Sequence, residues 1–198
     1  MERINGIKKM TDNRYLNMYE LDATFRNGTR GNYYIASRRS RVDQLKAVTH
    51  DDRPDGVILY GVHGEKKNKV VLVRQFRYPI NGYVYEFPAG LVEPGEDALE
   101  AGVREMKEET GLEFTPIQTA PGYFTTVGMT DEACATVFGY CSGEPSVDGQ
   151  EGSEDIQVVL ADREECKRIL KEENVAIMCA YMLMHFIASD GDPLAFLL

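Results

Sequence analysis

Apolar residues between positions 56 and 161 occur in runs that have the length and spacing of β-strands. Two runs, residues 56–62 and 69–78, are rich in β-branched and aromatic residues and predict strands. Tyr83, Tyr85 and Phe87 then alternate with other residues, which predicts a further strand. More strands are predicted over residues 114–126, 133–141 and 155–161. The intervening residues 142–153 are rich in Gly, Ser and acidic residues and predict a loop.

Helical patterns lie between and after these strands. Residues 97–110 place Leu99, Val103 and Met106 at positions i, i+4 and i+7, which predicts one apolar stripe along a helix. Gly111 supplies a C-terminal stop for this helix. Two later helices are predicted over residues 162–173 and 174–189. Strands flanked by helices predict an α/β fold, an α/β/α sandwich around a mixed sheet.

The first 50 residues have a different pattern and predict a small antiparallel sheet. Asn27–Gly28 is a strong hairpin signal. Strands of this sheet are predicted over residues 15–25, 31–37 and 43–49. A chain of 198 residues with 43% hydrophobic residues suits one main domain with a small extension. We therefore divide the chain into an N-terminal β subdomain, residues 1–50, and a main domain, residues 51–198.

The segment from Gly90 to Leu112 concentrates acidic residues around one arginine, Arg104. Besides Glu100, its carboxylates are those of Glu93, Glu96, Asp97, Glu105, Glu108 and Glu109. The last three are related by i+3 and i+4 and share one helical face, where like charges repel by roughly 0.2–0.5 kcal/mol per pair. Mg²⁺ prefers oxygen ligands and is held by a few carboxylates together with water and phosphate. The segment therefore predicts a metal and phosphate site; the alternative is a solvated acidic helix paired with Arg104 and Lys107.

The spacing within this segment resembles the Nudix box at every defined position. The residues that carry the resemblance are Gly90, Glu96, Arg104, Glu105, Glu108, Glu109 and Gly111. The resemblance extends over roughly residues 50 to 190. It implies the Nudix α/β/α fold and an enzyme that hydrolyses the pyrophosphate of a nucleoside diphosphate linked to another group, with Mg²⁺ or Mn²⁺ as cofactor.

The resemblance also implies roles for single residues. Glu105 and Glu109 would be the principal metal ligands and would be essential for catalysis, and Glu108 would assist. Glu96 would contribute at the edge of the site, and the backbone carbonyl of Ala89 would complete the metal shell. Arg104 would orient the glutamates by salt bridges, with Gly90 and Gly111 in structural support.

Two further segments, QFRYPI and YEFPAG, resemble the branch of ADP-ribose and nucleotide-sugar pyrophosphatases. In that branch an N-terminal sheet builds a homodimer that shares substrate contacts, a layout that residues 1–50 match. The resemblance assigns substrate contacts to Arg77, Arg39, Met129 and Glu132. The alternative role for Arg77 is a surface salt bridge. The alternative for Arg39, and for its neighbours Arg38 and Arg41, is an exposed position on an edge strand without substrate contact. One departure, Val127 where the ADP-ribose enzymes commonly carry Pro, leaves GDP-mannose open as substrate.

The general base is expected on the loop before the last strand. Glu154 and Glu151 are the candidates, and Gly149 and Gly152 would make this loop flexible. A solvated acidic loop is the alternative. Adenine would need an aromatic platform; Tyr33, Tyr34 and Phe25 are candidates for it, and all three are also candidates for the core.

Charge and composition narrow the function further. The net charge of −10 argues against a nucleic-acid partner and disfavours capped RNA as substrate. Residues 1–50 nevertheless hold ten Lys and Arg against five Asp and Glu. No run of 18 apolar residues occurs and the N-terminus lacks a signal-peptide core, so we expect a cytoplasmic protein without a membrane partner. The four cysteines show no zinc spacing and predict reduced thiols.

The function expected from the sequence is Mg²⁺-dependent hydrolysis of ADP-ribose to AMP and ribose 5-phosphate. Another nucleoside diphosphate sugar is the first alternative substrate. A sensor that binds ADP-ribose without cleaving it is the alternative of a different class, although such proteins tend to lose the glutamates of the box and this chain keeps them.

Overall fold

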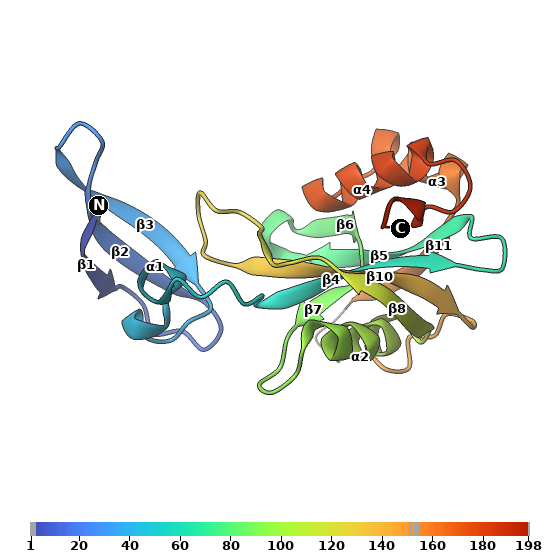
Figure 1. The fold of residues 1–198 in the computed structure, drawn as a ribbon, viewed down its shortest axis with the longest axis horizontal. Coiled ribbons are helices and arrows are strands. Elements are labelled where there is room, and N and C mark those ends of the chain that lie inside the picture. Colours follow the sequence, from blue (N-terminus) through green and yellow to red (C-terminus); the bar gives the residue numbers. More distant parts are fainter. Residues whose placement is uncertain (1–2, 151, 153–154, 198) are drawn as a thin grey trace. The chain divides into compact units, whose positions relative to one another are not determined.

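The computed structural model describes residues 3–150, 152 and 155–197, and the chain divides into two units (Figure 1). The first unit contains the residues up to 55 together with residues 122–134. The second contains residues 56–121 and 135–198. No helix in the described part of the chain is both long and apolar enough to cross a membrane.

The first unit is built on a three-stranded antiparallel sheet of order β1-β2-β3. Its strands are β1 (Ile4–Lys9), β2 (Asn17–Thr24) and β3 (Arg30–Ser37). Tyr19, Leu21, Ile35 and Leu45 form its buried core. The predicted small antiparallel sheet is therefore confirmed, although its first strand lies at residues 4–9.

The strand predicted over residues 43–49 is wrong. This segment forms the 3-10 turn η1 (Val42–Gln44) and the short helix α1 (Lys46–Thr49). The Asp131 carboxylate accepts a hydrogen bond of 3.2 Å from the Lys46 N–H, one of the N–H groups that a helix leaves without an internal partner. A residue 85 positions away thus stabilises the helix start.

The aromatic candidates for an adenine platform also lie in the first unit, and none is a core residue. Tyr33, Tyr34 and Phe25 are all exposed. Tyr33 donates a hydrogen bond to the Gly128 carbonyl at 2.7 Å, and Tyr34 donates one to the Glu20 carboxylate at 2.9 Å.

The larger sheet is mixed and has the strand order β11-β5-β4-β10-β8, with β6 beside β5, β7 beside β4 and β9 beside β10. Its strands are β4 (Gly56–His63), β5 (Lys69–Arg77), β6 (Gly82–Glu86), β7 (Ala89–Leu91), β8 (Glu113–Thr119), β9 (Tyr123–Phe124), β10 (Ala133–Ser142) and β11 (Ile156–Ala161). The single strand predicted over residues 114–126 is two strands, β8 and β9, and Pro121 lies between them.

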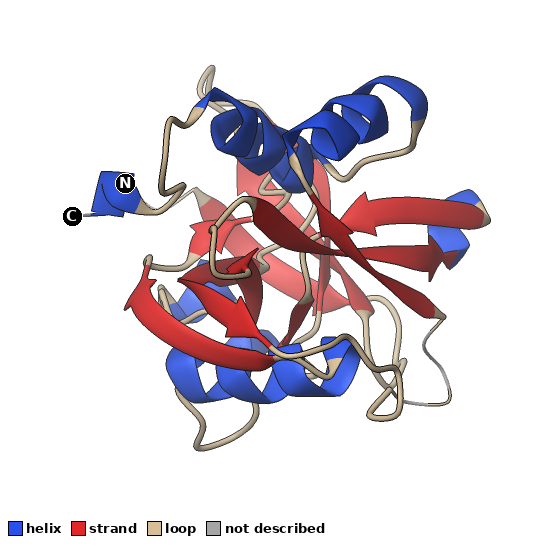
Figure 2. Cartoon of the chain, turned by 90° about the vertical axis from the view of Figure 1, so that its right-hand side faces the viewer, coloured by secondary structure: helices blue, strands red, loops and turns tan. Residues whose placement is uncertain are grey.

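Helices cover both faces of this sheet in the second unit (Figures 1 and 2). The helix α2 (Ala98–Thr110) packs on one face, where Val57 and Leu59 of β4 meet Met106. The helices α3 (Arg163–Glu172) and α4 (Ile177–Ala188) pack on the other, where Tyr60 of β4 meets Phe186. Alternate β4 side chains therefore serve opposite layers, and the predicted α/β/α sandwich is confirmed.

The helix α2 is fixed at both ends. Asp97 is its N-cap and accepts hydrogen bonds from the Leu99 and Glu100 N–H groups, while the Glu100 side chain accepts one from the Asp97 N–H. This reciprocal capping box satisfies N–H groups that lack partners within the helix. At the other end Gly111 adopts the left-handed conformation, with φ 72°, and its N–H donates to the Lys107 carbonyl.

The predicted apolar stripe of α2 is wrong in part. Leu99 and Val103 are each 41% exposed, and of the three stripe residues only Met106 is fully buried. The buried face instead contains Gly102, where an added Cβ would come within 3.1 Å of Leu59, and it also contains Glu109. Glu109 therefore lies in the protein interior.

Candidate functional site

Arg104 joins three of the box carboxylates in the centre of the site. Its Nε and Nη2 atoms each donate to Glu96 at 2.9 Å, and its Nη1 donates to Glu105 at 2.8 Å and to Glu108 at 3.0 Å. Nη2 also donates to the Leu91 carbonyl at 3.0 Å. One guanidinium therefore faces three carboxylates and fixes them relative to β7.

This network shifts the ionisation of its members. Hydrogen bonds from Arg104 are the main cause that holds the pKa of Glu96 below its ordinary value of 4.5. The hydrogen bond to Glu96 is in turn the main cause that raises the pKa of Arg104. These mutual hydrogen bonds oppose the cost of burial and keep Glu96 and Arg104 charged at neutral pH.

Glu109 is the most buried carboxylate of the box, with 3% of its surface exposed. Its Oε2 accepts a hydrogen bond of 3.1 Å from the Ala89 N–H. Ala89 is held in place because β7 pairs with β4, where Ile58 lies opposite Ala89. Burying a carboxylate costs several kcal/mol unless donors or cations compensate it, which makes Glu109 unusual for a structural residue.

Gly90 leaves the space in which the Glu105 carboxylate lies. A Cβ atom added at Gly90 would overlap the Glu105 carboxylate. The backbone of β7 and the Glu105 side chain can therefore approach closely only while residue 90 has no side chain. Sequence spacing identifies Gly90, and the structure supplies this reason for it.

The donor chemistry of these residues fits a hard divalent cation, since their contacting atoms are carboxylate oxygens. Within residues 3–150, 152 and 155–197, however, no three acidic, His or Cys side chains are already grouped as a metal cage. Glu105 and Glu108 turn toward Arg104 instead.

Comparison with known proteins decides the family. The family model described as NUDIX domain matches residues 52–177. The chain belongs to the NUDIX family. The chain is similar to the ADP-ribose pyrophosphatase of Saccharomyces cerevisiae, 31% identical over 63% of this chain and 52% of that protein. Putative nudix hydrolase 2 of Caenorhabditis elegans is 34% identical over 63% of this chain and 54% of that protein. The chain thus spans about half the length of these relatives.

A solved structure supports the fold. The crystal structure of an ADP compounds hydrolase matches with a TM-score of 0.60 and 20% identity, over 85% of this chain and 82% of that chain. At this identity the likeness shows the shared architecture alone.

The structure also gives the surroundings of the other predicted site residues. Arg77 donates to the Glu86 carboxylate at 2.6 Å, the salt bridge that was its alternative. In the first unit Arg39 pairs with Asp55 at 2.5 Å, Glu132 accepts from Arg38 at 2.7 Å, and Met129 is exposed. The candidate bases Glu151 and Glu154 lie outside the described residues.

Two residues near the box escaped the sequence analysis. Glu86, the partner of Arg77, lies in the segment YEFPAG, but that segment served only to identify the branch. Gln150 donates from its side-chain amide to the Glu109 carbonyl at 2.9 Å. Loop composition gave no signal for this contact, because it joins residues 41 positions apart.

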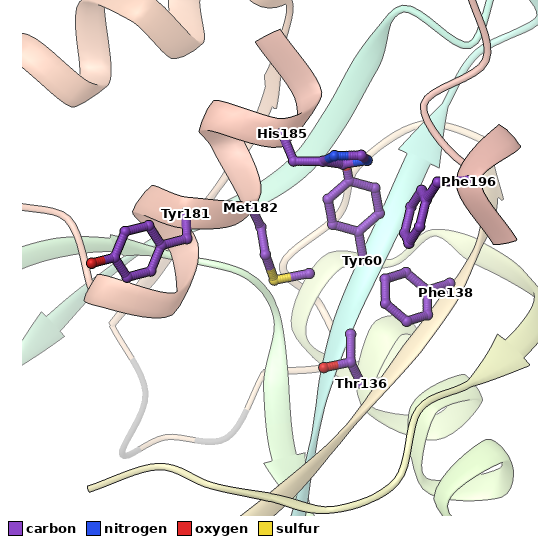
Figure 3. A pocket seen from close by; sticks show the side chains of 7 residues that line it. All are labelled: Tyr60, Thr136, Phe138, Tyr181, Met182, His185 and Phe196. Carbon is purple, nitrogen blue, oxygen red and sulfur yellow. The ribbon is translucent and has the colours of Figure 1, made fainter. Parts of the chain in front are cut away.

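An apolar cavity of about 250 Å³ opens on the opposite side of the sheet, beside α4 (Figure 3). Its lining consists of Tyr60, Thr136, Phe138, Tyr181, Met182, His185 and Phe196. These residues include no carboxylate and no Lys or Arg, so the lining lacks the charges that a diphosphate or a metal ion requires.

Proposed function

We propose that this protein is a metal-dependent pyrophosphatase that hydrolyses ADP-ribose to AMP and ribose 5-phosphate. The observation that carries the proposal is the nearly complete burial of the Glu109 carboxylate beside the Arg104 network of Glu96, Glu105 and Glu108. Such a concentration of negative charge is stabilised by a divalent cation, and a bound cation in turn attracts phosphate.

Glu105 and Glu109 would hold Mg²⁺, or Mn²⁺ in its place, with Glu108 in support and Glu96 at the edge. The Ala89 carbonyl is the proposed backbone ligand. When bound, such a metal supplies Lewis acidity toward the phosphoryl oxygens and lowers the pKa of an attacking water. Arg104 keeps Glu105 and Glu108 ordered, and a loop glutamate, Glu151 or Glu154, would accept the proton of that water.

The substrate assignment rests on two supports. The yeast relative is named an ADP-ribose pyrophosphatase, and QFRYPI with YEFPAG resembles the same branch. Arg77 and Glu86 are partners on neighbouring strands, and Arg77 would exchange this partner for a substrate phosphate. GDP-mannose is the alternative substrate, because Val127 stands where ADP-ribose enzymes commonly carry Pro. A sensor without catalysis is less well supported, because every glutamate of the box is present.

A substrate panel tests the proposal. Purified protein with Mg²⁺ is incubated with ADP-ribose, GDP-mannose and other nucleoside diphosphate sugars, and nucleoside monophosphate release is followed by chromatography. We expect ADP-ribose to give the highest kcat/KM. A higher kcat/KM for GDP-mannose would make GDP-mannose the assigned substrate. Binding of ADP-ribose without any turnover would show that the protein is a sensor and not a hydrolase.

We propose a homodimer on separate grounds. Met18 and Tyr34 are exposed on one face of the β2–β3 sheet, next to Glu20. An exposed apolar surface of this kind suits association with a second copy. Light scattering after gel filtration should give twice the mass of the 22.3 kDa chain, and a monomer at micromolar concentration would exclude the dimer.

A further inference from the structure

The segment that follows β10 returns to the C-terminal turn of α2. The last four carbonyl groups of an α-helix have no partner within the helix. In α2 the Ser146 N–H donates to the Thr110 carbonyl at 2.9 Å, and the Gln150 side-chain amide donates to the Glu109 carbonyl at 2.9 Å. Two of these carbonyl groups are therefore capped by residues from a distant loop.

The same segment lies directly against the backbone of the box glutamates. A Cβ atom added at Gly149 would lie 2.9 Å from the Glu108 carbonyl oxygen and 3.2 Å from the Glu108 Cα. Gly149 does not have a positive φ angle, so an alanine there would meet no backbone strain. Gly149 is thus needed for space, because only hydrogen fits between the loop and the helix.

The close approach continues one turn further along the chain. A Cβ atom added at Gly111 would lie 2.7 Å from the Ser146 nitrogen. Residues 146–150 therefore hold the last turn of α2 through backbone contacts at Gly111 and Glu108 and through the side chain of Gln150. The part of α2 held in this way carries Glu108 and Glu109.

We propose that residues 146–150 form a clamp that positions Glu108 and Glu109 for metal binding, with Gln150 and Gly149 as positioning residues. This inference rests on the proposed function, since it assumes that these glutamates bind a divalent cation. Neither residue would contact the metal. The clamp acts through the backbone of the helix turn, where a small displacement would move both carboxylates together.

Direct measurement of Mn²⁺ binding tests the clamp without relying on turnover. Electron paramagnetic resonance measures the concentration of free Mn²⁺ in a titration. The titration gives the Kd for Mn²⁺ of the wild type and of two variants, Gly149→Ala and Gln150→Met. The methionine keeps the length of Gln150 but cannot donate to the Glu109 carbonyl. Replacing a residue that orients metal ligands typically lowers metal affinity by 10- to 100-fold. We therefore expect the Kd for Mn²⁺ to rise on the order of 10-fold in each variant.

Matched substitutions serve as controls. Gly152→Ala changes a glycine in the same loop, where an added Cβ would meet nothing within 4 Å. Gln118→Met makes the same exchange at an exposed position of β8. We expect both controls to bind Mn²⁺ within twofold of the wild type. Circular dichroism checks that each variant is folded, and should Gly149→Ala fail to fold, Gln150→Met decides alone.

The outcomes separate the clamp from the proposed function. Mn²⁺ affinity of Gln150→Met equal to that of Gln118→Met would overturn the clamp. A wild type that binds no Mn²⁺ would overturn it as well, because no metal site would then exist to be positioned. A wild type that binds Mn²⁺ but does not hydrolyse ADP-ribose would contradict the proposed function, while the binding comparison would still decide the clamp.

Discussion

The Ala89 N–H donates a hydrogen bond to the Glu109 carboxylate across 3.1 Å, although the two residues lie 20 positions apart. This bond joins strand β7 to the buried side of helix α2. It keeps a carboxylate in an interior position where only 3% of the residue is exposed. The arrangement has a clear physical reason if Glu109 holds a cation during function.

Replacing Glu109 by Gln should therefore affect catalysis far more than folding. The amide is nearly isosteric, and its oxygen can still accept from Ala89, but it lacks the charge that a metal requires. Metal ions supply several kcal/mol of charge stabilisation, so we expect kcat for ADP-ribose to fall by at least about 100-fold. Steady-state kinetics with saturating Mg²⁺ measures this.

Glu113→Gln is the matched control for this variant. Glu113 follows the end of α2 and pairs with Lys107 on the surface. Exposed ion pairs contribute roughly 0–1 kcal/mol to folding stability, so this replacement should leave the protein folded. We expect its kcat to stay within about twofold of the wild-type value. Equal kinetics for the Glu109 and Glu113 variants would refute the role of Glu109.

Gly90→Ala should displace Glu105 while leaving the fold intact. The added methyl would overlap the Glu105 carboxylate, which is the end of a flexible side chain and can move away. We expect the Mg²⁺ concentration for half-maximal activity to rise on the order of 10-fold. Gly82→Ala, where the nearest atom is 3.7 Å away, should leave it unchanged. A crystal structure of Gly90→Ala with Glu105 in its original place would contradict the explanation.

Arg104→Met should lower stability in a pH-dependent way. Because Arg104 depresses the pKa of Glu96 below 4.5, their interaction stabilises the fold above that pH and is lost as the pH falls through the native pKa. Arg104 is 27% exposed, between a surface and a buried ion pair, so we expect a loss of roughly 2 kcal/mol at pH 7.

Urea unfolding at pH 7 and at successively lower pH measures this effect. The difference between wild type and Arg104→Met should shrink below pH 4.5. Lys167→Met removes an exposed pair with Glu164 and should show a small difference at every pH. A deficit of Arg104→Met that stays constant down to pH 3 would show that lost packing, not charge, causes it.

Asp97→Ala should destabilise the protein through the start of α2. The Asp97 carboxylate accepts from two N–H groups at 2.8 and 2.9 Å, and loss of such a cap costs about 1 kcal/mol. Asp97→Ser should recover most of this loss, because serine is also a good N-cap. Thermal and urea unfolding check both variants, and equal stabilities for Ala and Ser would argue against the cap.

The layered fold of the second unit could be predicted from the sequence because its longer strands, β4, β5 and β10, carry many apolar residues and end at clear turns. The local sequence pattern was insufficient where contacts with distant residues determine the conformation or orientation of an element. Leu99 and Val103 have helical spacing, yet close packing at Gly102 turns them toward solvent. The strand predicted over residues 43–49 is a helix that Asp131 supports from far along the chain.

The site divides in the same way. Helical geometry brings Arg104 and Glu108 together at i and i+4, so spacing alone predicts their proximity. The bonds from Ala89 and Gln150 to Glu109 depend on how β7 and the loop after β10 fold back, which no local pattern encodes. The partners of Arg77 and Arg39 depend on tertiary structure as well.

The metal dependence of ADP-ribose cleavage tests the central claim most directly. Wild-type protein stripped of metal with EDTA is titrated with Mg²⁺, and AMP and ribose 5-phosphate are quantified by chromatography. We predict no product without metal and equimolar AMP and ribose 5-phosphate once Mg²⁺ is restored. Product formation that is unaffected by EDTA, or no product at any Mg²⁺ concentration, would contradict the account.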